Sequence, residues 1–169
     1  MSSSSRRVHR RAVLGGLGVL PIGLAGCFRP LLAEGGDAQR VQGKIGLPAV
    51  DGRFGYFLSQ SLEDRLGTPV DPQFRLEVST RLRDRDLAIA QNNDVTRKTV
   101  IAQTTWRLFR LGQASPVLRD DITVQSGFNA TTSLFATRQA RLDIERRLAR
   151  DIGERIARAL LARADLLTT

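Results

Sequence analysis

The sequence predicts an α+β fold: a two-layer sandwich in which two helices cover one face of a four-stranded, mostly antiparallel sheet. Three observations lead to this prediction. Apolar and polar residues alternate in several segments between residues 41 and 128. Apolar residues repeat at helical spacing before residue 67 and after residue 133, on either side of the three longer alternating segments. Short turn sequences separate those three segments from one another. Strands joined by short turns form an antiparallel meander, which helices can cover on one face. The expected order is β-α-β-β-β-α.

The first strand and the first helix are predicted between residues 41 and 67. Apolar residues alternate with Gln, Lys and Gly over residues 41–47, and Pro48 ends this strand. Asp51 is a suitable N-cap for a helix in which large apolar residues recur every four positions over residues 54–66. Gly67 ends that helix, and we expect its apolar stripe to belong to the core.

Three longer strands follow. The first begins at Phe74 and carries apolar residues on one face and mostly charged residues on the other. The second covers residues 99–111 and the third residues 117–128. Turn-forming residues at 92–94 and 112–116 separate the three strands, which predicts a meander.

A long helix is predicted from about Ser133 to Ala164. The side of this helix that faces away from its apolar stripe is crowded with arginines, and acidic residues three or four positions away offset part of their charge. We expect most of these arginines to form a solvated helix face. The apolar stripe steps by four residues and consists of Ile144, Leu148, Ile152, Ile156 and Leu160.

The N-terminal segment has the pattern of a secretory signal. A basic stretch that ends at Arg10-Arg11 precedes residues 12–26, which carry no charge and end in small residues. This run is shorter than the roughly 20 apolar residues that span a bilayer. Leu24-Ala25-Gly26-Cys27 closely resembles the end of bacterial lipoprotein signals. We therefore expect a signal peptide at residues 1–26 and a protein that begins at an acylated Cys27 and is anchored to a membrane by its lipid.

The export route and the target membrane follow less directly from the same segment. Arg10-Arg11 resembles a twin-arginine export signal, but an ordinary Sec signal fits as well. Phe28 stands where Asp would be expected for retention in the inner membrane, so by resemblance to known sorting signals the outer membrane is favoured. Residues 29–40 contain Pro and Gly without periodicity, so we predict a tether at residues 27–40 and a folded domain at 41–166.

Composition excludes several kinds of active site. The chain carries a net charge of +9, but four of these charges lie in the signal, which leaves +5. The single histidine, His9, also lies there, and Cys27 is the only cysteine. The domain therefore lacks the residues for a Ser-His-Asp or Cys-His arrangement and for a zinc site. Asp84 with Asp86 and Asp120-Asp121 are close acidic pairs, but each lies beside arginine and is expected at the surface. We predict no enzyme, no metal and no cofactor.

Four short motifs together resemble one protein family. They are Cys27-Phe28-Arg29-Pro30-Leu31-Leu32, Thr96-Arg97, Ser126-Gly127-Phe128-Asn129 and Phe135-Ala136-Thr137. In this order, and behind a lipoprotein signal, they resemble the LPS-assembly lipoprotein family, LptE, in its alphaproteobacterial form. The resemblance implies a small outer-membrane lipoprotein that sits inside the LptD β-barrel as a plug, assists the assembly of the barrel, and contacts lipopolysaccharide on its way to the outer leaflet. It implies no catalysed reaction.

The candidate ligand-binding residues are Arg97 and Lys98, beside the turn at residues 92–94, and Arg138, at the start of the long helix. Arginine binds phosphate through two hydrogen bonds and keeps its charge, and lipopolysaccharide carries phosphates and acidic sugars. The resemblance places basic contacts for lipopolysaccharide near Arg97 and Arg138.

Other functions compete with this one. An auxiliary lipoprotein of an ABC-type lipid transporter would also be small, acylated and α/β, and it would differ by having an inner-membrane permease as its partner. An envelope enzyme such as a cell-wall hydrolase is disfavoured because the domain lacks histidine. A nucleic-acid partner, suggested by a pI of about 11.3, is inconsistent with export from the cell.

Overall fold

The computed structural model describes residues 36–89 and 95–168. The predicted signal peptide, Cys27, most of the predicted tether and the predicted turn at 92–94 lie outside the described residues. Helices and strands follow one another in the order α1-β1-α2-β2-β3-β4-α3-α4. Their bounds are Asp37–Val41 (α1), Ile45–Gly46 (β1), Gly52–Leu66 (α2), Phe74–Ile89 (β2), Val95–Arg110 (β3), Pro116–Asn129 (β4), Leu134–Leu161 (α3) and Ala164–Leu167 (α4).

The four strands form one sheet in the order β1-β2-β3-β4. β2, β3 and β4 pair antiparallel as a meander, whereas β1 pairs parallel to the start of β2, with Ile45 opposite Phe74. In the middle of the sheet, Trp106 of β3 lies opposite Val78 of β2 and Asp120 of β4. The predicted α+β fold and mostly antiparallel sheet are confirmed.

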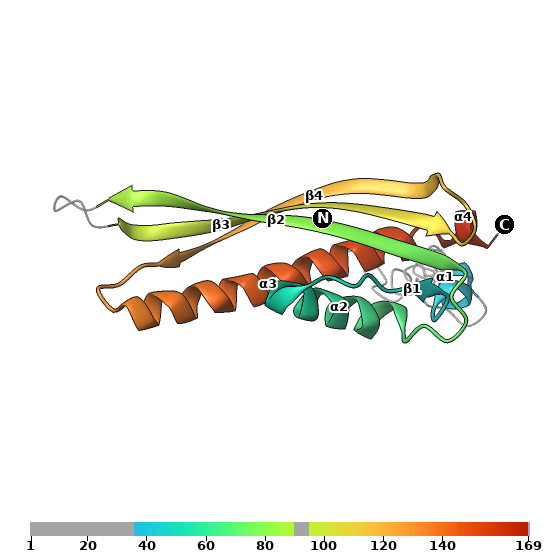
Figure 1. Ribbon diagram of the computed structural model, residues 1–169, viewed down its shortest axis with the longest axis horizontal. Coiled ribbons are helices and arrows are strands. Elements are labelled where there is room, and N and C mark those ends of the chain that lie inside the picture. The colour runs from blue at the N-terminus through green and yellow to red at the C-terminus, as the bar shows by residue number, and fades with distance from the viewer. Residues whose placement is uncertain (1–35, 90–94, 169) are drawn as a thin grey trace, which may run out of the picture.

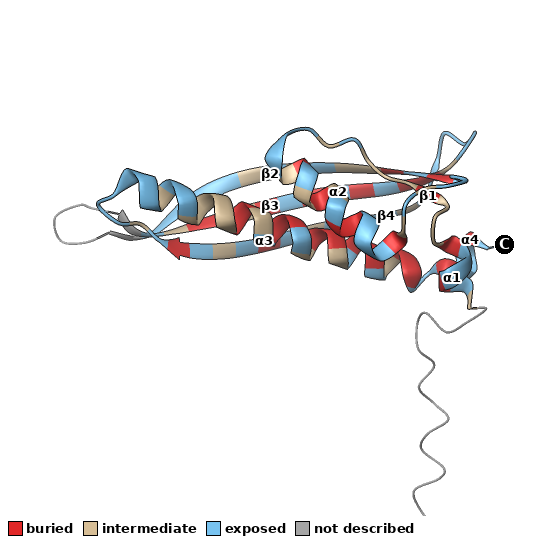
Figure 2. Ribbon diagram, turned by 90° about the horizontal axis from the view of Figure 1, so that it is seen from below, coloured by how far each residue is buried: buried red, intermediate tan, exposed pale blue. Residues whose placement is uncertain are grey.

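The helices cover one face of the sheet and leave the other uncovered. Figure 1 shows α2 and α3 side by side beneath the three long strands, and no helix or strand of residues 36–89 and 95–168 lies on the far side of the sheet. Every second residue of β3 from Val100 to Leu108 is buried, because alternate side chains of a strand point to the same face. Figure 2 shows the buried residues concentrated where α2 and α3 meet the sheet, whereas the beginning of α3 is exposed.

A glycine allows α2 and α3 to pack closely. A Cβ atom on Gly153 of α3 would lie 2.7 Å from both Cβ and Oγ of Ser61 in α2 and 3.2 Å from the carbonyl oxygen of Leu58. Ser61 is buried, and its hydroxyl donates to the carbonyl oxygen of Arg150, 3.1 Å away. Because Gly153 has no side chain and only the small side chain of Ser61 lies between the two helices here, this contact fixes how far α2 stands from α3.

The long helix forms where the sequence predicts it, and Ser133 is its N-cap. The predicted stripe from Ile144 to Leu160 is buried. Ion pairs at i,i+3 and i,i+4 spacing lie on the other side, for example between Arg155 and Asp151. None of the helices within residues 36–89 and 95–168 combines the length and the apolar character needed to cross a bilayer.

Two details differ from the sequence pattern. The first strand contains only Ile45 and Gly46, because pairing with β2 is limited to two residues. The structure adds two short helices, α1 and α4, which pack against each other at the end of the domain where the described chain begins. Ala38 and Val41 of α1 are buried there. Five- and four-residue helices show little periodicity, and these two depend on tertiary contact for their stability.

Candidate functional site

A groove lies at the opposite end of the domain, where α3 begins. It has a volume of about 540 Å³ and is open to solvent. Its walls come from β2, β3, β4 and the first two turns of α3, so residues far apart in the chain meet in it. The lining residues are Asp84, Lys98, Phe128, Leu134, Phe135, Thr137, Arg138 and Arg141.

Local hydrogen bonds fix the first turn of α3 against the end of β4. The hydroxyl of Ser133 caps the helix by accepting from the backbone N–H of Ala136, 3.3 Å away. The hydroxyl of Thr137 accepts from the N–H of Thr131 at 3.1 Å and donates to its carbonyl oxygen at 3.2 Å. The groove residues of this first turn are therefore held in place by the chain that leads into the helix.

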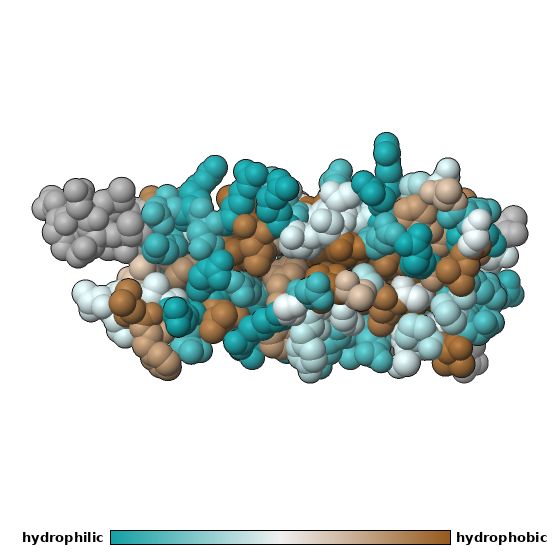
Figure 3. Space-filling view, viewed as in Figure 1, coloured by the Kyte–Doolittle hydropathy of each residue, from teal (hydrophilic) through white to brown (hydrophobic). Residues whose placement is uncertain are grey.

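The apolar wall of the groove is exposed to an unusual degree. Leu134 is 86% exposed and Phe135 is 74% exposed, although both are large apolar side chains. Phe128 of β4 lies on the inner face of the sheet beside them and is mostly buried. Figure 3 shows hydrophobic atoms at this end of the molecule, flanked by hydrophilic ones. An exposed apolar patch with a polar rim is typical of a binding surface.

The cations of the groove differ in how far they are neutralised. Arg141 donates to Asp84 and to Glu145, and the hydrogen bond to Asp84 is the main reason why the pKa of Arg141 is raised above its ordinary value. Lys98 pairs with Asp86 across the strands at 3.4 Å. Within the described residues, no carboxylate lies within ion-pair distance of Arg138. Arg138 is therefore the positive charge most available to a ligand.

The structure brings two of the three predicted binding residues together. Lys98 and Arg138 line the groove, but Arg97 does not. Arg97 and Lys98 are consecutive residues of β3, so their side chains point to opposite faces of the sheet. The guanidinium of Arg97 lies on the uncovered face next to Gly127, where a Cβ atom would be 3.7 Å from its Nε.

Sequence reasoning missed the apolar half of the groove. The motifs that include Phe128 and Phe135 resemble those of a family, but their pattern predicts no apolar surface. The available signal was Leu134-Phe135 immediately after the cap residue Ser133, where the periodic stripe of the helix has not yet begun. Arg141 is one of the arginines on the polar side of the predicted helix, and the structure places it against Asp84 of β2.

The acidic pairs are neutralised or dispersed. Asp84 and Asp86 point toward the helices, where they meet Arg141 and Lys98. Asp121 accepts a hydrogen bond from Thr105 at 2.5 Å. In the described part of the chain, no three Asp, Glu, His or Cys side chains are grouped closely enough to hold a metal ion.

The arrangement suits an amphiphilic anion. An acyl chain or sugar face can cover Leu134 and Phe135, while Arg138 and Lys98 meet phosphate or carboxylate groups at the rim. The first turn of α3 contains no acidic residue, so the positive end of the helix dipole adds to this potential.

Comparisons with known proteins support the fold. No family model matches the chain, and no curated protein matches its sequence. Several solved structures are similar. A candidate lipoprotein from Caulobacter crescentus has a TM-score of 0.61 and 20% identity, and the match covers 76% of this chain and 96% of that one. Rare lipoprotein B from Shewanella oneidensis has a TM-score of 0.59 and 12% identity, with 74% and 98% covered. A minor lipoprotein from Acinetobacter baumannii has a TM-score of 0.55 and 15% identity, with 70% and 89% covered. At these identities the likeness concerns the fold.

Proposed function

We propose that this protein is an outer-membrane lipoprotein that helps to deliver lipopolysaccharide to the outer leaflet in partnership with an LptD-like β-barrel. In this account, acylation at Cys27 holds the domain at the membrane, and the barrel is the partner that the domain plugs and helps to assemble. The groove at the start of α3 contacts the lipopolysaccharide.

The groove carries the proposal. It combines an exposed apolar wall, Leu134 and Phe135, with the cations Arg138 and Lys98. Lipopolysaccharide has the matching combination of acyl chains, sugars and clustered phosphates. Arginine is suited to phosphate because its planar guanidinium can donate two parallel hydrogen bonds.

Two further observations support the envelope location. Leu24-Ala25-Gly26-Cys27 at the end of an uncharged run resembles a lipoprotein signal. The solved structures that share this fold are called lipoproteins in three different bacteria. The barrel partner is supported by the polar, basic face of the sheet, because the lumen of a large outer-membrane barrel is polar.

The test uses the full chain in its own host cell. Depletion of the protein is expected to lower lipopolysaccharide at the cell surface, and the acylated protein is expected to co-purify with one β-barrel protein from detergent-extracted outer membranes. A chain with Lys98→Gln and Arg138→Gln should restore surface lipopolysaccharide poorly. A chain with Arg150→Gln and Arg158→Gln, which loses the same charge from the exposed side of α3, should restore it fully. Normal surface lipopolysaccharide after depletion, together with no barrel partner, would refute the proposal.

A further inference from the structure

The uncovered face of the sheet is strongly basic. Because side chains alternate between faces, every second residue of β2, β3 and β4 points away from the helices. These outward positions hold seven arginines but only two acidic residues, Glu77 and Asp121, among the described residues. The arginines are Arg75, Arg81, Arg83, Arg85, Arg97, Arg107 and Arg119. We call this surface the arginine face.

Strand β2 separates its own charges. Arg81, Arg83 and Arg85 point outward, whereas Asp84 and Asp86 lie on the helix side and pair with Arg141 and Lys98. The acidic residues next to the arginines in sequence therefore do not neutralise them. In the part of the chain that the structure describes, no carboxylate lies within ion-pair distance of the three outward arginines.

Two arginines also face each other across strands. Arg107 of β3 lies directly opposite Arg119 of β4, an arrangement of like charges that destabilises a sheet. The nearest carboxylates on this face are Glu77, which lies opposite Arg107 on β2 but pairs with Arg75, and Asp121, which accepts from Thr105. The isolated domain thus carries a repulsion that carboxylates from a partner would relieve.

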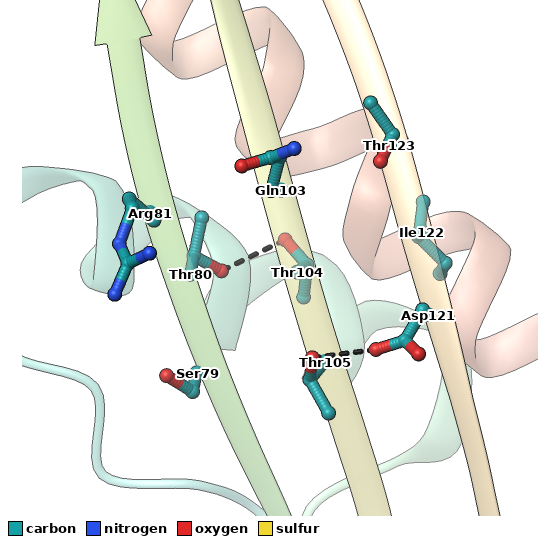
Figure 4. A pocket seen from close by; sticks show the side chains of 9 residues that line it. All are labelled: Ser79, Thr80, Arg81, Gln103, Thr104, Thr105, Asp121, Ile122 and Thr123. Carbon is teal, nitrogen blue, oxygen red and sulfur yellow. Dashed lines mark hydrogen bonds between the residues drawn. The ribbon is translucent and has the colours of Figure 1, made fainter.

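Small polar side chains keep the centre of the arginine face shallow. Ser79, Gln103, Thr105 and Thr123 project from three adjacent strands around an open hollow of about 510 Å³ (Figure 4). Among the described residues of this face, Phe109 carries the one aromatic ring, and the guanidinium of Arg75 covers it at 4.8 Å. At its centre the face therefore offers hydrogen-bonding groups and positive charge.

We propose that the arginine face docks against a protein surface that presents acidic side chains on β-strands. From Arg75 to Arg85 the arginines of β2 extend over about 34 Å, at roughly 3.4 Å per residue. A compact lipid headgroup would neutralise one or two of them, so an extended partner fits better. Acidic residues at alternate positions of a strand repeat every 7 Å or so, which is the spacing of Arg81, Arg83 and Arg85. An extended acidic glycan fits less well, because the described residues of the face offer no free aromatic ring on which a sugar could stack.

The inference rests on the proposed function for its choice of a β-sheet partner. It adds that the arginine face meets this partner and that acidic side chains of the partner bind there. Site-specific photo-crosslinking of the full acylated chain in living cells can test the docking of the arginine face separately from the proposed function. One photoreactive residue, p-benzoylphenylalanine, replaces Gln103 at the centre of the arginine face. A second chain carries it in place of Leu134 in the groove. A third carries it in place of Gln139, an exposed residue of α3 outside the groove lining.

We expect the probe at position 103 to give a protein adduct whose cross-linked segment, identified by mass spectrometry, is a β-strand with Asp or Glu at alternate positions. Adding Arg81→Gln and Arg83→Gln should lower the yield about tenfold, whereas Arg147→Gln and Arg158→Gln should leave it nearly unchanged. Three results at position 103 would each overturn the inference: adducts to lipid or glycan alone, no adduct at all, or a cross-linked protein segment without acidic residues. Failure of the proposed function would show separately, as the absence of a lipopolysaccharide adduct at position 134.

A charge reversal gives an independent check that does not depend on loss of folding. Arg119→Glu places a carboxylate opposite Arg107 and should raise the melting temperature of the isolated protein while lowering the cross-linking yield at position 103. A variant that melts earlier, or one that cross-links as well as the unchanged chain, would contradict the inference.

Discussion

Arg141 of α3 donates two hydrogen bonds to Asp84 of β2, at 3.0 Å and 3.3 Å, across a separation of 57 residues in the chain. This contact joins the second half of β2 to α3, the helix that carries the groove. It also leaves Arg138, one turn earlier on α3, as the cation of the groove without a described ion-pair partner. The structural contact and the available charge are thus neighbours with different roles.

The contact between Asp84 and Arg141 should contribute modestly to stability. Both side chains are more than a third exposed, so we expect Asp84→Asn to lower the free energy of unfolding by about 0.5–1 kcal/mol. Urea denaturation of Asp84→Asn, Arg141→Gln and the double variant would measure the coupling. Losses that simply add in the double variant would show that Asp84 and Arg141 do not stabilise each other. Arg141→Gln alone should cost more than Asp84→Asn, because it also removes the ion pair with Glu145.

The stability contributed by the Thr80 hydroxyl should depend on the hydroxyl of Thr104. The two hydroxyls lie 2.9 Å apart on the helix side of the sheet, and Thr104 is almost fully buried (Figure 4). Thr80→Val alone should cost about 1–2 kcal/mol, because the remaining hydroxyl loses its partner. The double change to Val should be nearly neutral. A double variant as unstable as the sum of the singles would contradict this.

The close contact of α2 with α3 should make Gly153→Ala destabilising, although alanine favours a helix. The new Cβ would meet Ser61, so we expect a loss of about 1–3 kcal/mol in thermal or urea unfolding. Ser61→Gly removes the two atoms at 2.7 Å and should restore part of the stability to the Gly153→Ala chain. No restoration would mean that the helix spacing depends on other contacts.

Asp143 should make stability depend on acidic pH. A hydrogen bond from Arg146, and then the charge of Arg147, hold the pKa of Asp143 below its ordinary 3.8. Because the folded pKa is lowered, this contribution is present above the unfolded pKa and is lost as pH falls through the folded pKa. Asp143→Asn should therefore flatten the fall of the unfolding free energy below about pH 4. Asp71→Asn is the control, since Asp71 is exposed and has no ion pair among the described residues. An equal effect of both substitutions would contradict the assignment.

Much of the fold could be predicted from the sequence because the signals were long. Alternation over β2, β3 and β4 and the four-residue steps of α3 extend over many residues, so chance matches are rare. Helix α1 could not be predicted in this way, and alternation over residues 41–47 predicted a longer first strand than the two-residue β1. The residues of α1 and β1 gain stability from contacts with α4 and β2, which are distant in sequence.

The site was less predictable because it depends on which elements meet. Lys98 and Arg138 were identified as basic residues next to turns, and the structure places both in one groove. Arg97 could have been separated from Lys98 by alternation alone, since neighbouring residues of a strand face opposite ways. The position of Leu134-Phe135 directly after Ser133 was the available signal for the apolar wall, but these residues line a groove only once the start of α3 lies against β3 and β4.

Equilibrium binding of purified lipopolysaccharide to the full acylated protein in detergent tests the central claim most directly. The account predicts saturable binding that weakens about tenfold, or roughly 1.4 kcal/mol, in the chain with Lys98→Gln and Arg138→Gln. It predicts no comparable change in the chain with Arg150→Gln and Arg158→Gln. Equal affinity of the three proteins, or no saturable binding to any of them, would contradict the assignment of the groove at the start of α3 as the lipopolysaccharide site.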